Sequence, residues 1–289
     1  MQPRRAAQGI CLSCAAACLF CVSQGVLADS IPKEIADAVA DPVRPAADRE
    51  RDTSFRPAEA LVFAGAKPGD NVAELMPGDG YFTRILCRTV GASGHVYAIG
   101  VAPQSNSIPD AQKADSLQVT SPQSSTTQPT CTNVSTITLR SRNFPAPELH
   151  SDSDDPGWVY EYYAARLPIE SFFAPEPLDT IWLCDIYRAL RTPLFGSPNM
   201  QWVNTAFLMA LKSGGVLVVA DSAAQPGSEV RDEKSPHRIE IDRVKRELLS
   251  AGFIFAGEYN IVDSANDARN AVKSQLHGTD RFLLKFRKP

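Results

Sequence analysis

Short apolar runs alternate with helix-like segments through most of this chain. Runs with the length and residue types of buried strands lie at 71–76, 95–99, 134–139, 180–184, 216–220, 253–261 and 281–286. Apolar residues at helical spacing predict helices over 58–64, 81–90, 199–211 and 237–250, and a glycine closely follows each of them. Strands separated by helices predict an α/β fold, a mostly parallel sheet with helices on both faces.

Three stretches break this rhythm. Residues 29–56 are charged and interrupted by prolines, and we expect an irregular arm or a short helix there. Residues 102–132 are dominated by Ser, Thr, Gln and Pro without a hydrophobic period, so this segment cannot pack a core. Residues 141–171 join an acidic tract to a group of aromatic side chains. We interpret the last two as irregular insertions, whose aromatics either cover a sheet edge or form a substrate lid.

Residues 1–28 have the features of a bacterial export signal. Two arginines near the start precede an uncharged apolar run, and small residues end the segment. Cleavage after Ala28 leaves an arm at 29–56 and a main domain at 57–289, with no further apolar run long enough to span a bilayer. This predicts an exported, periplasmic protein. The alternative is an uncleaved signal that anchors the chain in the inner membrane.

The charge balance argues against a nucleic-acid partner. The chain has 29 Lys and Arg against 33 Asp and Glu, a net charge of -4, so no overall positive field gathers phosphates. We expect a small-molecule ligand instead.

The cysteines and histidines do not form a recognisable ligand set. Once the signal is removed, Cys87, Cys131 and Cys184 remain of seven cysteines, which allows at most one intramolecular bridge and leaves the pairing open. The 4 histidines are scattered without the spacing of metal ligands. No metal site is therefore expected.

The first predicted strand ends in a turn with the features of a ligand site. Glu74 lies near the end of the strand, and Gly78 and Gly80 precede Tyr81, where the helix begins. In an open parallel sheet, ligands bind beyond the carboxyl ends of the strands at the switch point. Glycines let a ligand approach the backbone, and a helix N-terminus favours a negative group.

This turn resembles motif I of the class I S-adenosylmethionine-dependent methyltransferases, in which alternating glycines follow an acidic residue. Glu74 takes the acidic position, the two glycines take the second and third glycine positions, and Met76 stands where the first is expected. Segments 67–70 and 211–215 are similar to two further hallmarks of that superfamily, in the same order. The resemblance implies a Rossmann-like seven-stranded sheet with an antiparallel last strand, and S-adenosylmethionine as cofactor.

The similarity sharpens to the exported methyltransferase-like proteins of Gram-negative bacteria, over most of residues 40–100 and 172–289. Three positions depart from the expected patterns. The second strand ends in 98–101 without the acidic residue that usually holds the ribose hydroxyls. Residues 184–187 stand where the group has an Asn-Tyr-His-Asp run, and 221–222 where it has Asp-His. These departures weaken the case for catalysis while leaving the fold intact.

The strand ends and the resemblance together give two sets of candidate site residues. The cofactor-binding set is Glu74, Gly78, Gly80, Tyr81 and Asp221, and the catalytic set is Asp185, Tyr187 and His237. His237 would act as a general base near its usual pKa, or else simply cap a helix. Glu74 has the alternative role of a helix-end acceptor, and Tyr81 that of a packing ring. The charged cluster within 48–56 either closes over the site or forms a solvated ion-pair network.

Two classes of function follow. The first is S-adenosylmethionine-dependent methyl transfer, in which the protein positions the acceptor for in-line displacement and, for some acceptors, supplies a base. The second is a catalytically degenerate binding or scaffold protein of the periplasm, which the compartment favours because the cofactor is made in the cytoplasm. A third, dinucleotide binding on a similar sheet, lacks the full G-x-G-x-x-G spacing.

Overall fold

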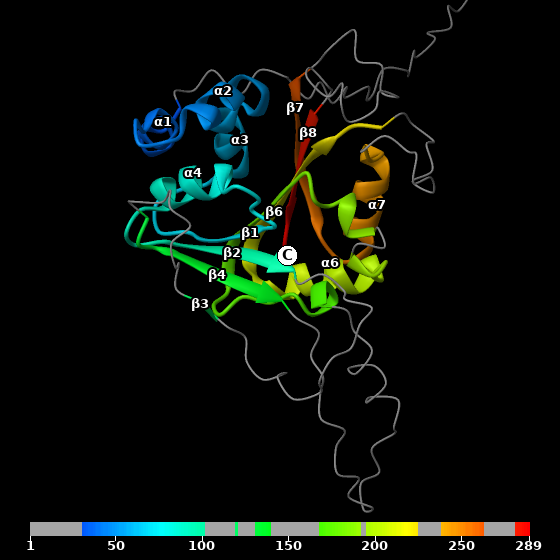
Figure 1. Ribbon diagram of the computed structural model, residues 1–289. Coiled ribbons are helices and arrows are strands. Elements are labelled where there is room, and N and C mark those ends of the chain that lie inside the picture. Colours follow the sequence, from blue (N-terminus) through cyan, green and yellow to red (C-terminus); the bar gives the residue numbers. More distant parts are fainter. Residues whose placement is uncertain are drawn as a thin grey trace, which may run out of the picture. The chain divides into compact units, whose positions relative to one another are not determined.

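One eight-stranded sheet runs through the part of the chain that the structure, a computed structural model, describes: residues 31–101, 119–120, 131–139, 168–191, 195–224, 238–262 and 281–289. In chain order the strands are β1 (Asn71–Leu75), β2 (His95–Val101), β3 (Val119–Thr120), β4 (Val134–Leu139), β5 (Leu178–Cys184), β6 (Leu211–Ser222), β7 (Ile254–Val262) and β8 (Arg281–Arg287). Their order across the sheet is β3-β4-β2-β1-β5-β6-β8-β7 (Figure 1).

Most neighbouring strands are parallel. β2 and β4 lie on one side of β1, β5 and β6 lie on the other, and all five run in the same direction. β8 is antiparallel to both of its neighbours, β6 and β7. The predicted Rossmann-like sheet with an antiparallel last strand is therefore confirmed, and β3 adds a two-residue strand that the sequence did not predict. Because the chain builds outward on one side of β1 and then crosses to the other, the switch point lies between β1 and β5.

Helices cover both faces of the sheet, as predicted (Figure 1). They are α1 (Lys33–Ala40), α2 (Ala46–Phe55), α3 (Pro57–Ala64), α4 (Tyr81–Val90), α6 (Met200–Ala210) and α7 (Ile241–Ser250), with short 3-10 helices η1 (Pro168–Ser171) and η2 (Ala189–Arg191). Side chains alternate along β1, so that Val72 packs in an apolar cluster with α1, α3 and α4. Ala73 and Leu75 pack in the opposite cluster, with α6 and α7.

The N-terminal arm is more regular than the sequence suggested. Residues 33–55 form α1 and α2, each preceded by a proline, instead of an irregular segment or one short helix. Ile35 and Ala38 of α1 are buried in the cluster with α3 and α4. These two apolar side chains pack the arm against the domain.

β6 begins at Leu211, although the sequence predicted a helix as far as 211 and a strand only from 216. Leu211 pairs with Leu178 of β5. Gly214 N–H donates to the carbonyl of Lys288, and Lys288 N–H donates to that of Gly215, at 3.1 and 2.9 Å. The chain's last residues thus hold this glycine segment in the sheet.

Several predicted features lie outside the described residues, among them the export signal, most of both insertions and His237, which was expected to open α7. Two pieces of the first insertion are described, and both contact the rest of the chain. Residues 119–120 pair with β4, and Cys131 is bonded to Cys87, so this segment is attached to the core at two points. Among the described helices, none combines the length and apolarity needed to cross a bilayer.

Candidate ligand site

The turn between β1 and α4 has an unusual backbone. Met76, Gly78 and Gly80 adopt left-handed conformations with φ of 53°, 58° and 80°. Gly80 N–H donates to the carbonyl of Pro77 at 2.9 Å, which closes the turn directly before α4. Gly78 is exposed, and a Cβ built on it would meet no atom within 4 Å. The backbone here is open to a ligand approaching the carboxyl end of β1.

Met76 stands at the first glycine position and still adopts a glycine-like conformation. It is held against β2 by two contacts: its N–H donates to Ile99 O at 2.7 Å, and its Sδ accepts from Val101 N–H at 3.3 Å. The end of β2, from Ala98 to Val101, carries no acidic side chain. The Met76 thioether and backbone groups therefore lie at the end of β2, where the resemblance predicted a carboxylate that holds a ribose.

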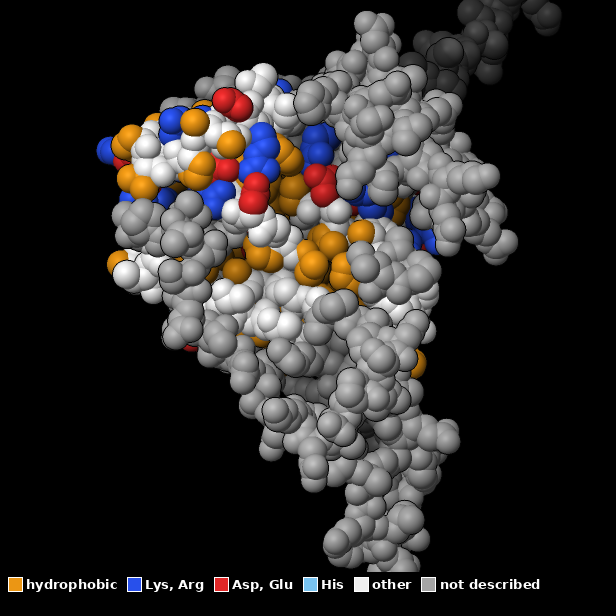
Figure 2. Space-filling view, viewed as in Figure 1, with side chains coloured by type: hydrophobic (Ala, Val, Ile, Leu, Met, Phe, Trp, Pro, Cys, Tyr) orange, Lys and Arg blue, Asp and Glu red, His pale blue; other side chains and the backbone are white. Residues whose placement is uncertain are grey.

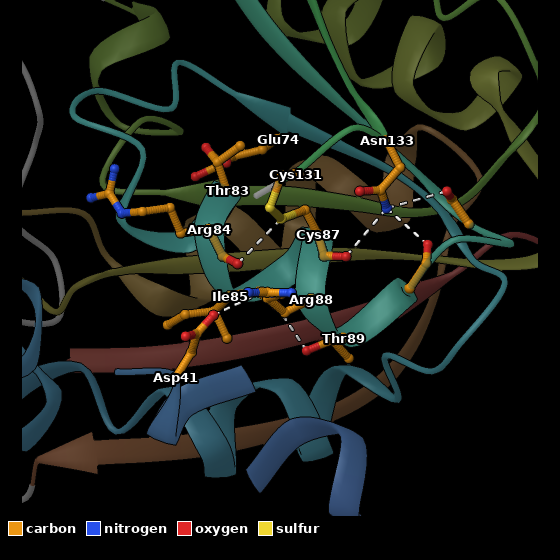
Figure 3. The surroundings of a disulfide bond; sticks show 12 residues. Asp41, Glu74, Thr83, Arg84, Ile85, Cys87, Arg88, Thr89, Cys131 and Asn133 are labelled. Carbon is orange, nitrogen blue, oxygen red and sulfur yellow. Dashed lines mark hydrogen bonds and ion pairs between the residues drawn. A yellow bond between two sulfur atoms is a disulfide. The ribbon is translucent and has the colours of Figure 1, made fainter. Parts of the chain in front are cut away.

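Glu74 points beneath α4, where its side chain accepts a hydrogen bond from Thr83 (Figure 3). The residue is 4% exposed. Burial raises the pKa of Glu74 from 4.5 to about 8, although the hydrogen bond from Thr83 and the charge of Arg84 act in the opposite direction. The carboxyl is thus mostly protonated at neutral pH. This geometry favours the alternative role of an acceptor that fixes α4 on β1.

Tyr81 is covered by α2. Its hydroxyl donates to Asp52 Oδ1 at 2.7 Å, and the guanidinium carbon of Arg51 lies 4.7 Å from the centre of its ring. Arg51 also donates to Asp79 Oδ2 in the turn at 2.8 Å. Both the hydroxyl and the ring of Tyr81 are therefore engaged by the arm, which favours its role as a packing ring.

The charged cluster of the arm is an ion-pair network between α2, α4 and the turn. Asp48 is 2% exposed and accepts from Arg51 Nη2 at 2.9 Å and from Arg84 Nε at 2.7 Å. Arg44, 3% exposed, donates to both carboxylate oxygens of Asp52. Basic and acidic side chains lie next to one another on the part of the surface above α4 in Figure 2. The network fixes the arm over the first turn of α4.

Asp185 directly follows β5 and Asp221 lies near the end of β6; Arg188 joins the two carboxylates, and Arg281 binds Asp185 as well. Arg188 donates to Asp221 Oδ1 and, at 3.2 Å, to Asp185 Oδ1. Arg281 donates to Asp185 Oδ2 at 2.9 Å. Burial would raise the pKa of Asp185, but Arg281 and Arg188 outweigh it and lower the pKa. The Cys184 thiol lies 3.6 Å from Arg281 Nη2. We call Asp185, Asp221, Arg188, Arg281 and Cys184 the aspartate-arginine cluster.

Tyr187 lies apart from the turn. It is fully buried, and its hydroxyl contacts Asn204 on α6 and Glu247 on α7 at 3.2 and 3.0 Å. Burial is the main reason that the pKa of Tyr187 is raised, with the charge of Glu247 adding to it. The hydroxyl therefore stabilises the packing of two helices.

Another catalytic candidate, Asp185, adopts φ of 57°, which turns the chain sharply after β5.

Sequence reasoning missed the two arginines of the cluster. Arg188 follows Asp185 by one helical turn, a spacing that allows an ion pair, and this signal could have been used. No local sequence signal indicated Arg281. It meets Asp185 only because the antiparallel pairing of β6 and β8 places Arg281 beside Ser222. Within the described residues, no group of three or more His, Cys, Asp or Glu side chains could hold a metal ion.

No protein-family profile and no curated protein sequence matches this chain. Among solved structures, it is similar to an S-adenosylmethionine-dependent methyltransferase from Aquifex aeolicus, with a TM-score of 0.44 and 15% identity over 85% of this chain and 99% of the other. It is also similar to an N-methyltransferase from Bradyrhizobium japonicum, with a TM-score of 0.42 and 12% identity over 84% and 98%. A TehB-like S-adenosylmethionine-dependent methyltransferase from Corynebacterium glutamicum has a TM-score of 0.41 and 11% identity over 85% and 100%.

Proposed function

We propose that this protein is methyltransferase-like and binds S-adenosylmethionine at the turn between β1 and α4. One observation carries the proposal. The turn places Gly78, exposed and with open space before it, at the carboxyl end of the central strand and beside the switch point of the sheet. The adjacent α4 N-terminus favours the carboxylate of an amino-acid ligand. The ligand would supply an activated methyl group, and the chain would position it.

Two roles are compatible with such binding. Methyl transfer needs a group at the ends of β5 or β6 that can orient the acceptor, and Asp185 is the candidate because its side chain is 32% exposed. The alternative is a catalytically degenerate binding or scaffold protein. The aspartate-arginine cluster favours this alternative, since Asp221 is fully buried and neutralised by Arg188.

We further propose that the protein is exported to the periplasm after removal of residues 1–28, with an arm at 29–56 and a main domain at 57–289. The disulfide between Cys87 and Cys131 supports this location, because such bonds persist in oxidising compartments. Mass spectrometry of the exported protein should find Asp29 as its first residue. Recovery of the full-length chain from the membrane fraction would instead establish the inner-membrane anchor.

Calorimetric titration of the mature protein with S-adenosylmethionine and S-adenosylhomocysteine tests the binding proposal. We expect dissociation constants on the order of 100 µM or weaker, because the end of β2 lacks the carboxylate that would pair with a ribose. Gly78→Val should abolish binding, since its side chain would fill the space in front of the turn.

Gly65→Val is the matched control. Gly65 also has a positive φ, of 84°, and a Cβ built on it would likewise meet no atom within 4 Å, but it ends α3 away from the turn. Both variants therefore carry similar backbone strain. Binding by Gly78→Val as tight as that of Gly65→Val would refute the proposed site, and absence of binding to the wild-type protein would refute the ligand.

A transfer assay separates the two roles. The protein is incubated with methyl-labelled S-adenosylmethionine and a mixture of small carboxylates, phenols and amines, and formation of S-adenosylhomocysteine is followed. Turnover that falls at least tenfold in Asp185→Asn, with unchanged affinity for S-adenosylhomocysteine, supports methyl transfer. Binding without turnover supports the binding or scaffold role.

A further inference from the structure

The disulfide joins α4, one of the helices that cover the sheet, to the segment that leads into β4. Cys87 lies in α4 and Cys131 directly before β4, with their Cα atoms 6.1 Å apart (Figure 3). The two cysteines are 44 positions apart in the sequence, and β2 and most of the first insertion lie between them. The bond therefore fixes the residues directly before β4 against α4.

Asn133 makes the same connection without a covalent bond. Its Nδ2 donates to the carbonyls of Cys87, Gly91 and Gly94, at 3.2, 2.8 and 3.3 Å, and so occupies the C-terminal end of α4. Residues 131–133 thus form a clamp between α4 and β4. We call them the return clamp.

The two sides of this clamp differ in how firmly they are held. α4 is fixed independently, by Thr83 on Glu74 and by Arg88 Nε on Asp41 at 2.7 Å. β4 pairs along its length with β2, but its other edge is covered over only two residue pairs by β3. β4 is therefore the less firmly held side of the clamp, with its buried side chains and its pairing with β2 as its main attachments.

We propose that the Cys87–Cys131 disulfide is a redox lock on the β3–β4 edge of the sheet. While oxidised, it keeps β4 next to β2, because a released strand would remain tethered at Cys131, three residues before β4 begins at Val134. Reduction removes this tether, so an opened β4 gains chain entropy and the strand opens more often than in the oxidised protein. This inference does not depend on the ligand proposed above.

The burial of the two sulfurs determines how a dithiol would open the lock. Cys131 is partly exposed, whereas Cys87 is 2% exposed in an apolar cluster. A thiolate of the reagent attacks the Cys131 sulfur, and the Cys87 sulfur leaves with the electron pair and takes a proton. The second thiol of the reagent then displaces Cys131, so the protein gains two thiols and the reagent becomes a disulfide. The apolar surroundings make Cys87 a poor leaving thiolate, so reduction should be slow in the folded protein.

Hydrogen exchange of the mature protein with and without dithiothreitol tests the lock, with peptides covering 134–139 as the readout and peptides covering β5 as the internal reference. Reduction should speed exchange in β4 roughly 10- to 1,000-fold relative to the oxidised protein and leave β5 unchanged. Cys131→Ser should exchange at the reduced rate with or without the reagent. Thr132→Ser, a neighbouring exposed position, should behave like the wild-type protein.

The result that would overturn the proposal is equal exchange in β4 before and after complete reduction, verified by alkylation of both thiols. A rise of the same size in β4 and β5 would also overturn it, since this would mean that the bond stabilises the whole domain and not one edge. Because Cys131 is partly exposed, its serine variant should fold, and the dithiothreitol arm needs no variant at all.

Discussion

The hydroxyl of Tyr81 donates a 2.7 Å hydrogen bond to Asp52 Oδ1, linking the first residue of α4 to the N-terminal arm. Asp52 is also paired with Arg44, whose side chain is almost fully buried. The start of the helix that borders the candidate site is therefore set by a segment that precedes the main domain. This contact makes the arm part of the site's architecture.

Removal of that hydroxyl should weaken the arm without changing ligand binding. In Tyr81→Phe the ring keeps its contacts with Arg51, but the buried hydrogen bond is lost, so the free energy of unfolding should fall by about 1 kcal/mol. Urea titration measures this loss, and calorimetry with S-adenosylhomocysteine should give the wild-type affinity. A tenfold or larger loss of affinity at wild-type stability would show that Tyr81 contacts the ligand.

Glu74 should make stability depend on pH in the direction opposite to an ordinary ion-paired acid. Its pKa is about 8 in the folded protein against 4.5 without burial, so the folded state binds the proton more tightly. Below pH 4.5 both states are protonated, and this residue adds no pH dependence. As the pH rises from 4.5 to about 8, ionisation favours the unfolded chain, and stability falls by on the order of a few kcal/mol.

The variant Glu74→Gln isolates this effect, because its amide oxygen can still accept from Thr83 but cannot ionise. The difference in unfolding free energy between variant and wild-type protein should grow from pH 5 to pH 8, to about a few kcal/mol in favour of the variant. Glu258→Gln, at an exposed ion pair with Lys245, should follow the wild-type curve. A constant difference between Glu74→Gln and the wild-type protein across this range would contradict the raised pKa.

Removal of one partner from the Arg188–Asp221 ion pair should strongly destabilise the fold. In Arg188→Met, Asp221 remains fully buried and, among the described residues, retains only the N–H groups of residues 188 and 222 as donors. The free energy of unfolding should therefore fall by about 3–5 kcal/mol. Arg188→Met combined with Asp221→Asn removes the unpaired charge and should recover at least half of that loss. Arg243→Met, which removes a more exposed partner of Glu247, should cost less than about 1 kcal/mol. An additive double variant would mean that the two side chains do not interact.

Most of the first insertion should be dispensable if its anchor is kept. Replacing residues 104–130 with a short Gly/Ser linker retains Cys131 and the return clamp but removes β3, which covers only two residue pairs of β4. We expect the melting temperature to fall by no more than about 4 °C, equivalent to about 1–2 kcal/mol for a domain of this size. Scanning calorimetry measures this directly. Loss of a cooperative transition would mean that the insertion packs against the domain.

The sequence predicted what depends on local patterns. The ends of α4, at Tyr81 and Val90, follow from the glycines on either side, and β4 was assigned from the length and residue types of its run. The α/β class and the place of the candidate turn followed from the succession of such elements. Contacts between distant segments could not be predicted in this way, because Arg281 and Asp185 meet only once the sheet register is fixed.

The same limit applies to the directions of side chains. Glu74 was assigned to the right strand, but only the packing of α4 decides whether it faces a ligand or Thr83. Three cysteines could have formed the disulfide, and Cys87 pairs with Cys131 because the segment before β4 lies beside the end of α4. Tyr187 was interpreted as catalytic from its place after β5, whereas its fully buried hydroxyl lies among α6 and α7.

The central position of β1 has a consequence for how the chain folds as it is made. One neighbour, β2, follows almost at once, but the contact of Asn71 with Asp179 on the other side joins residues 108 positions apart. At a synthesis rate of about 5–20 residues per second, the β5-facing edge of β1 therefore waits roughly 5–20 s for its partner. During that interval an apolar strand edge is uncovered, and a chaperone that binds extended apolar segments would protect the nascent chain from misassembly.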